Sequence, residues 1–173
     1  RIGHTDSGFP EGVDATTSAS LQQTDDGIKG NAQMIAEWIA DESGGDLFAI
    51  ESEELYPADY NETVEKASKD QNAKTRPALT KHVDNMDQYE KVVLVFTNWW
   101  SDLPMPVYSF FDECDFSGKE IVVYATHEGS RFSGTVSTIS ELEPDATVTE
   151  GMSVRGGEVS ESEQAVRDSL KAK

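Results

Sequence analysis

The stretch that most constrains the fold of this chain is Lys91–Trp100, in which an apolar run stops abruptly at two adjacent tryptophans. Val92–Phe96 contains no polar residue, and continuous Val, Ile and Leu runs are typical of strands buried on both faces of a parallel sheet. Ligands of open α/β sheets bind just beyond the carboxyl ends of such strands. We therefore expect a buried strand at 92–97 with a candidate ligand site directly after it.

The tryptophan pair itself, Trp99 and Trp100, leads into a proline-containing loop at 101–106. Two indoles at the end of a strand would form a wall for a flat aromatic ligand, since such pockets are lined mainly by apolar and aromatic side chains. The alternative is a rigid loop in which one indole is buried for packing. The composition of the loop favours ligand contact and leaves the packing interpretation open.

Apolar runs and helical periodicity alternate over the rest of the chain, which predicts a single three-layer α/β domain over residues 1–173 with a parallel sheet and right-handed crossovers. Residues 1–29 are expected to be irregular, with a weak strand signal at 13–21 and a tight turn at 25–27. Arg76–Met86 is ambiguous. The expected strands lie at 47–50, 92–97, 121–125 and 147–154. The first expected helix begins at Asn31 and ends at Gly44-Gly45, and the next two cover 61–70 and 106–114. A fourth helix is expected to end near Leu142. The last helix is expected to start after Ser160, whose spacing to Glu163 is a capping-box pattern.

The composition excludes several classes of function. Asp and Glu total 33 against 14 Lys and Arg, a net charge of −19 that would repel a phosphate backbone, so nucleic-acid binding is not expected. The acidity suits either docking to basic protein partners or solubility in saline surroundings. No stretch has the roughly 18 apolar residues of a membrane helix, so membrane insertion is not expected. A single Cys114 excludes an internal disulfide and agrees with a reducing compartment, and we expect a cytoplasmic protein without a targeting peptide.

Two further segments could contribute to a ligand site. The loop Thr126–Phe132 follows the second buried strand and contains Gly129 and Ser130, whose backbone could approach the polar edge of a heterocycle. Gly30-Asn31-Ala32-Gln33 opens the first helix, where free N–H groups suit a phosphate. When each segment is taken alone, an ordinary turn and an ordinary helix cap are the better explanations, so the weight of both segments comes from their combination with the tryptophan loop.

Other chemistries lack support in the sequence. His4, His82 and His127 have no metal-ligand spacing, and Cys114 beside aromatic residues is typical of a buried thiol. Walker, nucleophile-elbow and dinucleotide motifs are missing from the sequence, so a hydrolytic site is not expected.

Five motifs follow one another along the chain: the helix start at 30–31, the loop Phe96–Trp100, the helix 105–111, the turn 115–119 and the loop Thr126–Ser130. Taken together, they resemble the flavodoxin family, most closely a bacterial branch. The resemblance runs from about Gly30 to the end of the chain. It implies a five-stranded parallel sheet in the order 2-1-3-4-5, one non-covalent FMN, and electron transfer. The bound flavin would perform the redox step, and aromatic rings and carboxylates near it would disfavour its anionic reduced form.

The resemblance also implies which residues contact FMN. The isoalloxazine ring would lie between two loops, and the phosphate would meet the first helix together with a segment near Arg1. The implied ring contacts are Thr97, Asn98, Trp99, Trp100, Thr126, His127, Glu128, Gly129 and Ser130, and the implied phosphate contacts are Gly3, His4, Thr5, Gly30, Asn31 and Ala32.

Two departures from the family pattern matter. Ala32 stands where the family has a hydroxyl residue, which removes one phosphate contact of about 0.5–1.5 kcal/mol. The apolar first strand expected before the phosphate loop is missing ahead of Arg1, which would leave a slot between the strands at 47–50 and 92–97. A truncated chain, substitution by residues 13–21, or a strand from another copy would each account for the gap, and we favour truncation. Without a substitute strand we expect impaired FMN binding.

The leading prediction is an FMN-binding electron carrier that docks transiently to redox proteins with basic surfaces. The first alternative is an NAD(P)H-dependent flavin or quinone reductase on the same fold. The second is a cofactor-free α/β binding module, which the missing strand and Ala32 favour. The sequence leaves the oligomeric state open.

Overall fold

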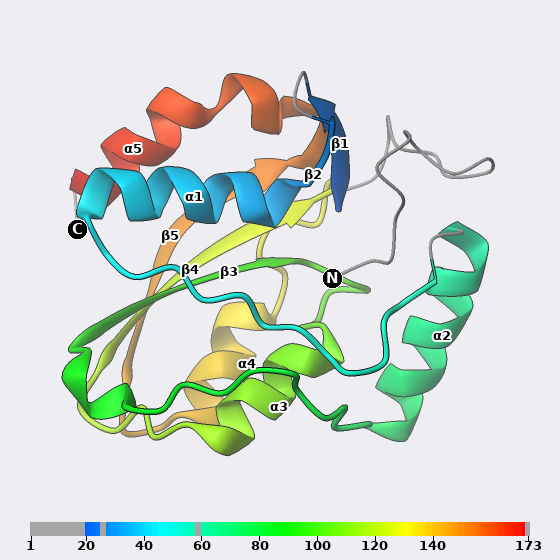
Figure 1. Ribbon diagram of the computed structural model, residues 1–173, viewed down its shortest axis with the longest axis horizontal. Helices are drawn as coiled ribbons and strands as arrows, with labels where there is room; N and C mark the ends of the chain where they lie inside the picture. Colours follow the sequence, from blue (N-terminus) through cyan, green and yellow to red (C-terminus); the bar gives the residue numbers. More distant parts are fainter. Residues whose placement is uncertain (1–19, 25–26, 58–59, 172–173) are drawn as a thin grey trace.

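The computed structural model describes residues 20–24, 27–57 and 60–171 (Figure 1). Most of the weak strand signal at 13–21, the turn residues Asp25 and Asp26, and the predicted phosphate contacts Gly3, His4 and Thr5 lie outside these residues. Within them, no helix combines the length and the apolar composition needed to cross a membrane.

The centre of the molecule is a parallel sheet of three strands, β3 (Lys91–Thr97), β4 (Glu120–His127) and β5 (Thr147–Arg155), in the order β3-β4-β5. The middle strand β4 is buried from residue 121 to residue 127, as its continuous apolar sequence predicts. The register pairs Thr97 with Thr126 and His127 with Arg155, so the three carboxyl ends meet at one edge of the sheet. The predicted α/β class and all three strands are confirmed.

Helices cover both faces of this sheet (Figure 1). On one face, α1 (Asn31–Ser43) and α5 (Glu163–Lys171) pack side by side, and Met34, Ile35 and Ile39 of α1 form a core with β4. On the other face lie α3 (Met105–Glu113) and α4 (Thr135–Leu142), whose core contains Phe110 and Ile139. The remaining helix, α2 (Tyr60–Ala73), lies at one side and contacts α3. These helices agree with the sequence predictions to within a few residues.

The sequence predicted an irregular segment before α1, but the described residues directly ahead of this helix, 20–24 and 27–30, include a β-hairpin. β1 (Leu21–Thr24) pairs antiparallel with β2 (Gly27–Gly30). Gly27 has a φ of 107°, a conformation that glycine adopts without steric cost, and this allows the sharp return of the chain. The hairpin delivers the chain directly to the start of α1.

The predicted strand at residues 47–50 is wrong. These residues form an exposed coil, in which the side chain of Leu47 is 56% exposed and Phe48 stacks on Phe110 at a centroid distance of 5.9 Å. A strand requires a hydrogen-bonded neighbour, and no backbone hydrogen bond joins residues 47–50 to β3 among the residues that the structure describes. The described sheet therefore tests the predicted order 2-1-3-4-5 over its last three positions only, where it holds.

Two short 3₁₀ helices complete the fold, η1 (Met86–Gln88) and η2 (Gly156–Glu161). The ambiguous residues 76–85 form a coil with one bridge, between Ser52 and Leu79. The predicted capping box at Ser160 is wrong, because Ser160 lies within η2. Ser162 precedes α5 instead, and its carbonyl oxygen accepts the N–H of Val166 at 2.9 Å.

A candidate ligand site at the carboxyl edge of the sheet

The loops that follow β3 and β4 are joined by a cluster of hydrogen bonds. The backbone N–H of Asn98 donates to the carbonyl oxygen of Thr126 at 2.8 Å, and the hydroxyls of Thr97 and Thr126 lie 2.9 Å apart. The side-chain amide of Asn98 reaches further, to the carbonyl oxygen of Arg131 at 2.8 Å and the hydroxyl of Ser133 at 3.2 Å. Three predicted site residues, Thr97, Asn98 and Thr126, are therefore brought together at one end of the sheet.

The tryptophan pair lies on a tight two-residue turn. Trp99 and Asp102 exchange two backbone hydrogen bonds, of 3.1 and 3.0 Å, and the two residues between them, Trp100 and Ser101, have φ values of 48° and 64°. Positive φ at both central positions is the pattern of a type I′ turn, which favours Asn-Gly. A non-glycine residue in this region costs about 1–2 kcal/mol. Backbone strain of this kind persists only where the surrounding structure holds it in place, and strained residues are concentrated at functional sites.

The two indoles have different environments: the packing interpretation applies to Trp99, and ligand contact by Trp100 stays a prediction. Trp99 is half-buried and meets the ring of Tyr56 edge-on, with centroids 5.0 Å apart and planes at 86°. Trp100 is 49% exposed. Trp99 therefore anchors the turn by packing, whereas Trp100 presents its indole to a ligand or to solvent.

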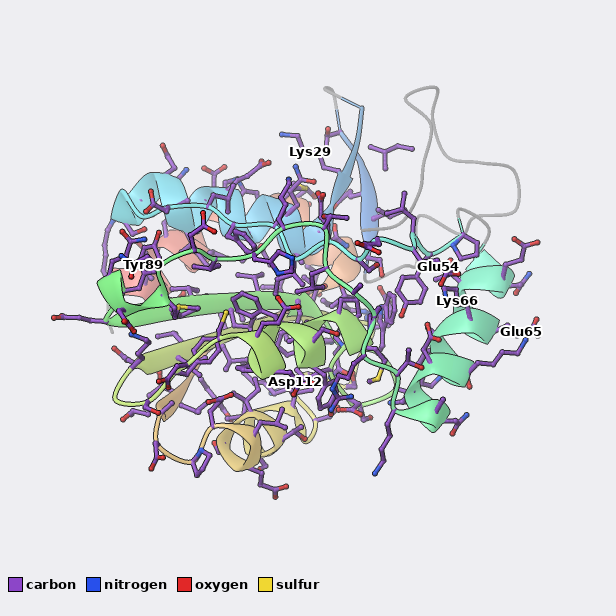
Figure 2. All side chains as sticks on the ribbon, turned by 60° about the horizontal axis from the view of Figure 1, so that its bottom comes forward. Lys29, Glu54, Glu65, Lys66, Tyr89 and Asp112 are labelled. Carbon is purple, nitrogen blue, oxygen red and sulfur yellow. The ribbon has the colours of Figure 1, made fainter. Side chains whose placement is uncertain are left out.

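Tyr56, which the sequence analysis missed, is anchored by α2. Its side chain is buried, its hydroxyl donates to Asp70 at 3.1 Å, and the ammonium group of Lys66 lies 5.4 Å from its ring centroid. Burial and the neighbouring carboxylates raise the pKa of Tyr56 far above its ordinary value. Lys66 also pairs with Glu54 at 3.2 Å, while Glu65 on the same helix points away from the molecule (Figure 2). Together these contacts fix the segment around Tyr56 against α2.

A small hollow lies between α2 and the tryptophan turn, and in this structure it has no room for a water molecule or a bound ring. Its wall is aromatic and apolar apart from Gln71, a composition typical of small-molecule sites. Trp99 and Trp100 are the two predicted residues in this wall. The other lining residues, which only the contact between segments distant in the sequence reveals, are Tyr56, Ala67, Gln71, Leu103, Pro104 and Met105.

The loop after β4 is organised by His127. This side chain is buried, and its Nδ1 accepts the backbone N–H of Gly129 at 2.9 Å, so Nδ1 carries no proton in this arrangement. Burial, assisted by the positive charges of Arg131 and Arg155 and opposed by Glu158, lowers the pKa of His127 below its ordinary value. Its neighbours Glu128, Gly129 and Ser130 are exposed, and Glu128 faces Arg155 at 3.8 Å. His127 therefore supports the loop, and the three exposed residues form its accessible part.

The predicted phosphate site at the start of α1 is partly occupied by the protein itself. The backbone N–H of Asn31 donates to the carbonyl oxygen of Ser20 at 2.9 Å, and its fully buried side chain donates to the carbonyl oxygen of Gly156 at 3.4 Å. Gly30 precedes the helix in an extended conformation. The N–H groups of Ala32 and Gln33 belong to the first helical turn, which has no carbonyl of its own helix to bond. These two amides are what the helix start offers to an anion.

The donor set fits a flavin ring better than a flavin phosphate. The exposed indole, the apolar residues beside it and the backbone of the 128–130 loop have the chemistry that suits a flat heterocycle. Asn98 adds a buried side-chain oxygen with no hydrogen-bond partner among the described residues. For the phosphate, the described residues offer the first-turn amides of α1. Within the same residues, no three His, Cys, Asp or Glu side chains are grouped as a metal site would require.

Comparisons with known proteins bear on the family and the fold. The model of the flavodoxin family matches residues 26–169. A crystal structure from Bacteroides eggerthii DSM 20697, of a protein provisionally classed as a flavoprotein, is 26% identical with a TM-score of 0.71, over 83% of this chain and 91% of that one. A protein from Bacteroides uniformis ATCC 8492, classed in the same way, is 22% identical with a TM-score of 0.69, over 79% of this chain and 88% of that one, and shows the same fold. None of the curated protein sequences is significantly similar. The chain belongs to the flavodoxin family.

Proposed function

We propose that this protein binds one FMN non-covalently and carries electrons between redox proteins. Membership of the flavodoxin family supports flavin binding, and the paired loops at the carboxyl edge of the sheet provide a site of suitable chemistry. FMN supplies the redox chemistry when it is bound. The protein contributes the pocket, the orientation of the ring and the electrostatic surroundings.

The observation that carries the proposal is the exposed indole of Trp100 on a strained turn at the end of β3. Stacking on the flavin ring would explain why a large aromatic residue occupies a turn position that favours asparagine. In this arrangement Asn98 and Thr126 hold the two loops together, and the 128–130 loop would meet the polar edge of the ring. The amides of Ala32 and Gln33 would bind the phosphate, together with the predicted contacts near the start of the chain.

The charge of the protein supports basic redox partners. A net charge of −19 would steer a positively charged protein toward it and would make association weaker as the salt concentration rises. Exposed carboxylates lie close to the hollow, among them Glu53 and Glu54, which precede Tyr56 in the chain. A transient interface at this edge would bring the partner near the flavin.

Titration of the purified protein with FMN tests the proposal. Binding should quench flavin fluorescence. Trp100→Ala should raise the Kd for FMN by about one to two powers of ten, which corresponds to roughly 1–3 kcal/mol of stacking on a heterocyclic base. Trp38→Phe, on α1, is the matched control and should change the Kd little. Steady oxidation of NADPH with a quinone acceptor would assign a reductase instead.

A cofactor-free binding module is the second candidate, because both the backbone N–H and the side-chain amide of Asn31 donate hydrogen bonds within the protein. This leaves a poorer anion site at the start of α1 than the family pattern implies. A protein that remains colourless and leaves FMN fluorescence unchanged at millimolar concentrations would favour this candidate over the first.

A further inference from the structure

The carboxylate of Asp102 joins three separate parts of the structure beside the tryptophan turn. Its Oδ1 accepts the backbone N–H of Leu103 at 2.7 Å and the hydroxyl of Tyr108, on α3, at 2.6 Å. Its Oδ2 accepts the side-chain amide of Gln71, on α2, at 3.3 Å. Asp102 is also the last residue of the turn, because its backbone exchanges two hydrogen bonds with Trp99.

The partners of Asp102 are themselves held in place. The guanidinium group of Arg76 lies 4.6 Å from the ring centroid of Tyr108 and pairs at 2.8 Å with Asp112, a residue of α3 that Figure 2 labels. Leu103 is 1% exposed, so the residue after the turn is fixed in the core. The hydroxyl of Tyr108 and the buried backbone at Leu103 are thus rigid donors, and an ionised acceptor makes such hydrogen bonds short and strong.

We infer that Asp102 is a positioning residue that holds the turn in its strained conformation and so fixes the indole of Trp100 at the flavin site. This inference rests on the proposed FMN site. Both carboxylate oxygens are engaged by the protein, so Asp102 acts through the turn and not by contact with the ligand. The turn has Trp100 and Ser101 where asparagine and glycine, respectively, are favoured, and it therefore needs support from outside the turn.

Three variants separate positioning from charge. Asp102→Ala removes all three side-chain hydrogen bonds and should weaken FMN binding about tenfold. Asp102→Asn keeps an acceptor for Leu103 and Tyr108 and should lose about threefold. Glu113→Ala, the matched control, removes an exposed carboxylate of α3 that pairs with His82 and touches neither the turn nor Tyr108, and its Kd should stay within about twofold of the wild type. Equal losses in Glu113→Ala and Asp102→Ala would overturn the inference, because net charge would then be the cause.

A rescue experiment tests the mechanism. Ser101→Gly relieves the positive φ at one of the two strained positions, so the turn needs less support. In the Asp102→Ala background, Ser101→Gly should recover at least half of the lost affinity on a logarithmic scale. Thermal unfolding of each variant establishes that it is folded. Failure of the rescue in a folded double variant would contradict a positioning role.

The same role can be measured without FMN. In ¹⁵N-labelled protein, the indole N–H signal of Trp100, assigned from its loss in Trp100→Phe, should shift and broaden in Asp102→Ala and keep its position in Glu113→Ala. If the wild-type protein does not bind FMN, the proposed function is wrong. The indole signal would then still test whether Asp102 positions Trp100. An unchanged Trp100 signal in Asp102→Ala would overturn the inference even if FMN binds.

Discussion

The side-chain amide of Asn98 donates a hydrogen bond of 2.8 Å to the carbonyl oxygen of Arg131, and this bond connects the turn after β3 to the loop after β4. Asn98 is 8% exposed and Arg131 has a φ of 54°, so a buried amide holds a residue in the left-handed region. The two candidate ligand loops therefore form one unit and not two independent turns.

Asn98→Ala should break this unit. The substitution leaves the carbonyl oxygen of Arg131 and the hydroxyl of Ser133 without their amide donor, and we expect the free energy of unfolding to fall by about 1–3 kcal/mol. Urea denaturation measures the change. Asn72→Ala, at an exposed position of α2, is the control and should lie within about 0.5 kcal/mol of the wild type. A similar small effect for Asn98→Ala would show that the loops are held by other contacts.

Gly151 is required by the close approach of Tyr124. A Cβ atom at Gly151 would lie 2.3 Å from the Tyr124 ring, which is fully buried and hydrogen-bonded through its hydroxyl to Ser169 at 2.9 Å. Gly151→Ala should therefore destabilise the protein by about 1–3 kcal/mol, because the ring has little room to move. Gly157→Ala, where no atom lies within 4 Å of the added Cβ, should be nearly neutral in the same thermal unfolding experiment. Equal melting temperatures for the two variants would refute the packing argument.

Ser101→Gly should stabilise the protein. Ser101 has a φ of 64°, and glycine adopts this conformation without the steric cost of a Cβ atom, so the free energy of unfolding should rise by about 1 kcal/mol. Ser137→Gly, at an exposed position in the middle of α4, should lower it by about 0.5–1 kcal/mol. Chemical denaturation of both variants checks the opposite signs. A loss of stability in Ser101→Gly would mean that the turn is not strained at this residue.

His127 should make stability depend on pH. Its pKa is lowered in the folded protein, mainly by burial, so the unfolded chain takes up a proton first as the pH falls below about 6.5. The free energy of unfolding should therefore decrease with falling pH below this value and level off once the folded protein also binds the proton.

His127→Asn separates this contribution from the carboxylates, which titrate at lower pH. The Asn side-chain oxygen can accept the N–H of Gly129 and does not titrate. The free energy of unfolding, measured by denaturation between pH 7.5 and 5.5, should therefore change less with pH in the variant than in the wild type. Identical slopes would contradict the assignment to His127.

The sequence by itself determined the sheet, most of the helices and the position of the candidate site. The apolar runs at 92–97 and 121–125 were long enough to specify buried strands, a weaker pattern indicated the strand at 147–154, and Gly44-Gly45 marked the end of α1. Since parallel strands run in the same direction, the residues after them had to meet at one edge. The position of the tryptophan pair at this edge followed directly.

Only the tertiary structure decided what these residues do there. The apolar residues 47–50 are not a strand, because a strand depends on a hydrogen-bonded neighbour that its own sequence does not provide. Asn31 is buried against Gly156, which lies 125 residues later in the chain. Trp99 packs on Tyr56, from a segment more than forty residues away, and Trp100 turns outward on a strained turn tied to α2 and α3 through Asp102. Local sequence set the order of these residues along the chain, but contacts between distant segments set which side chains are buried and which face a ligand.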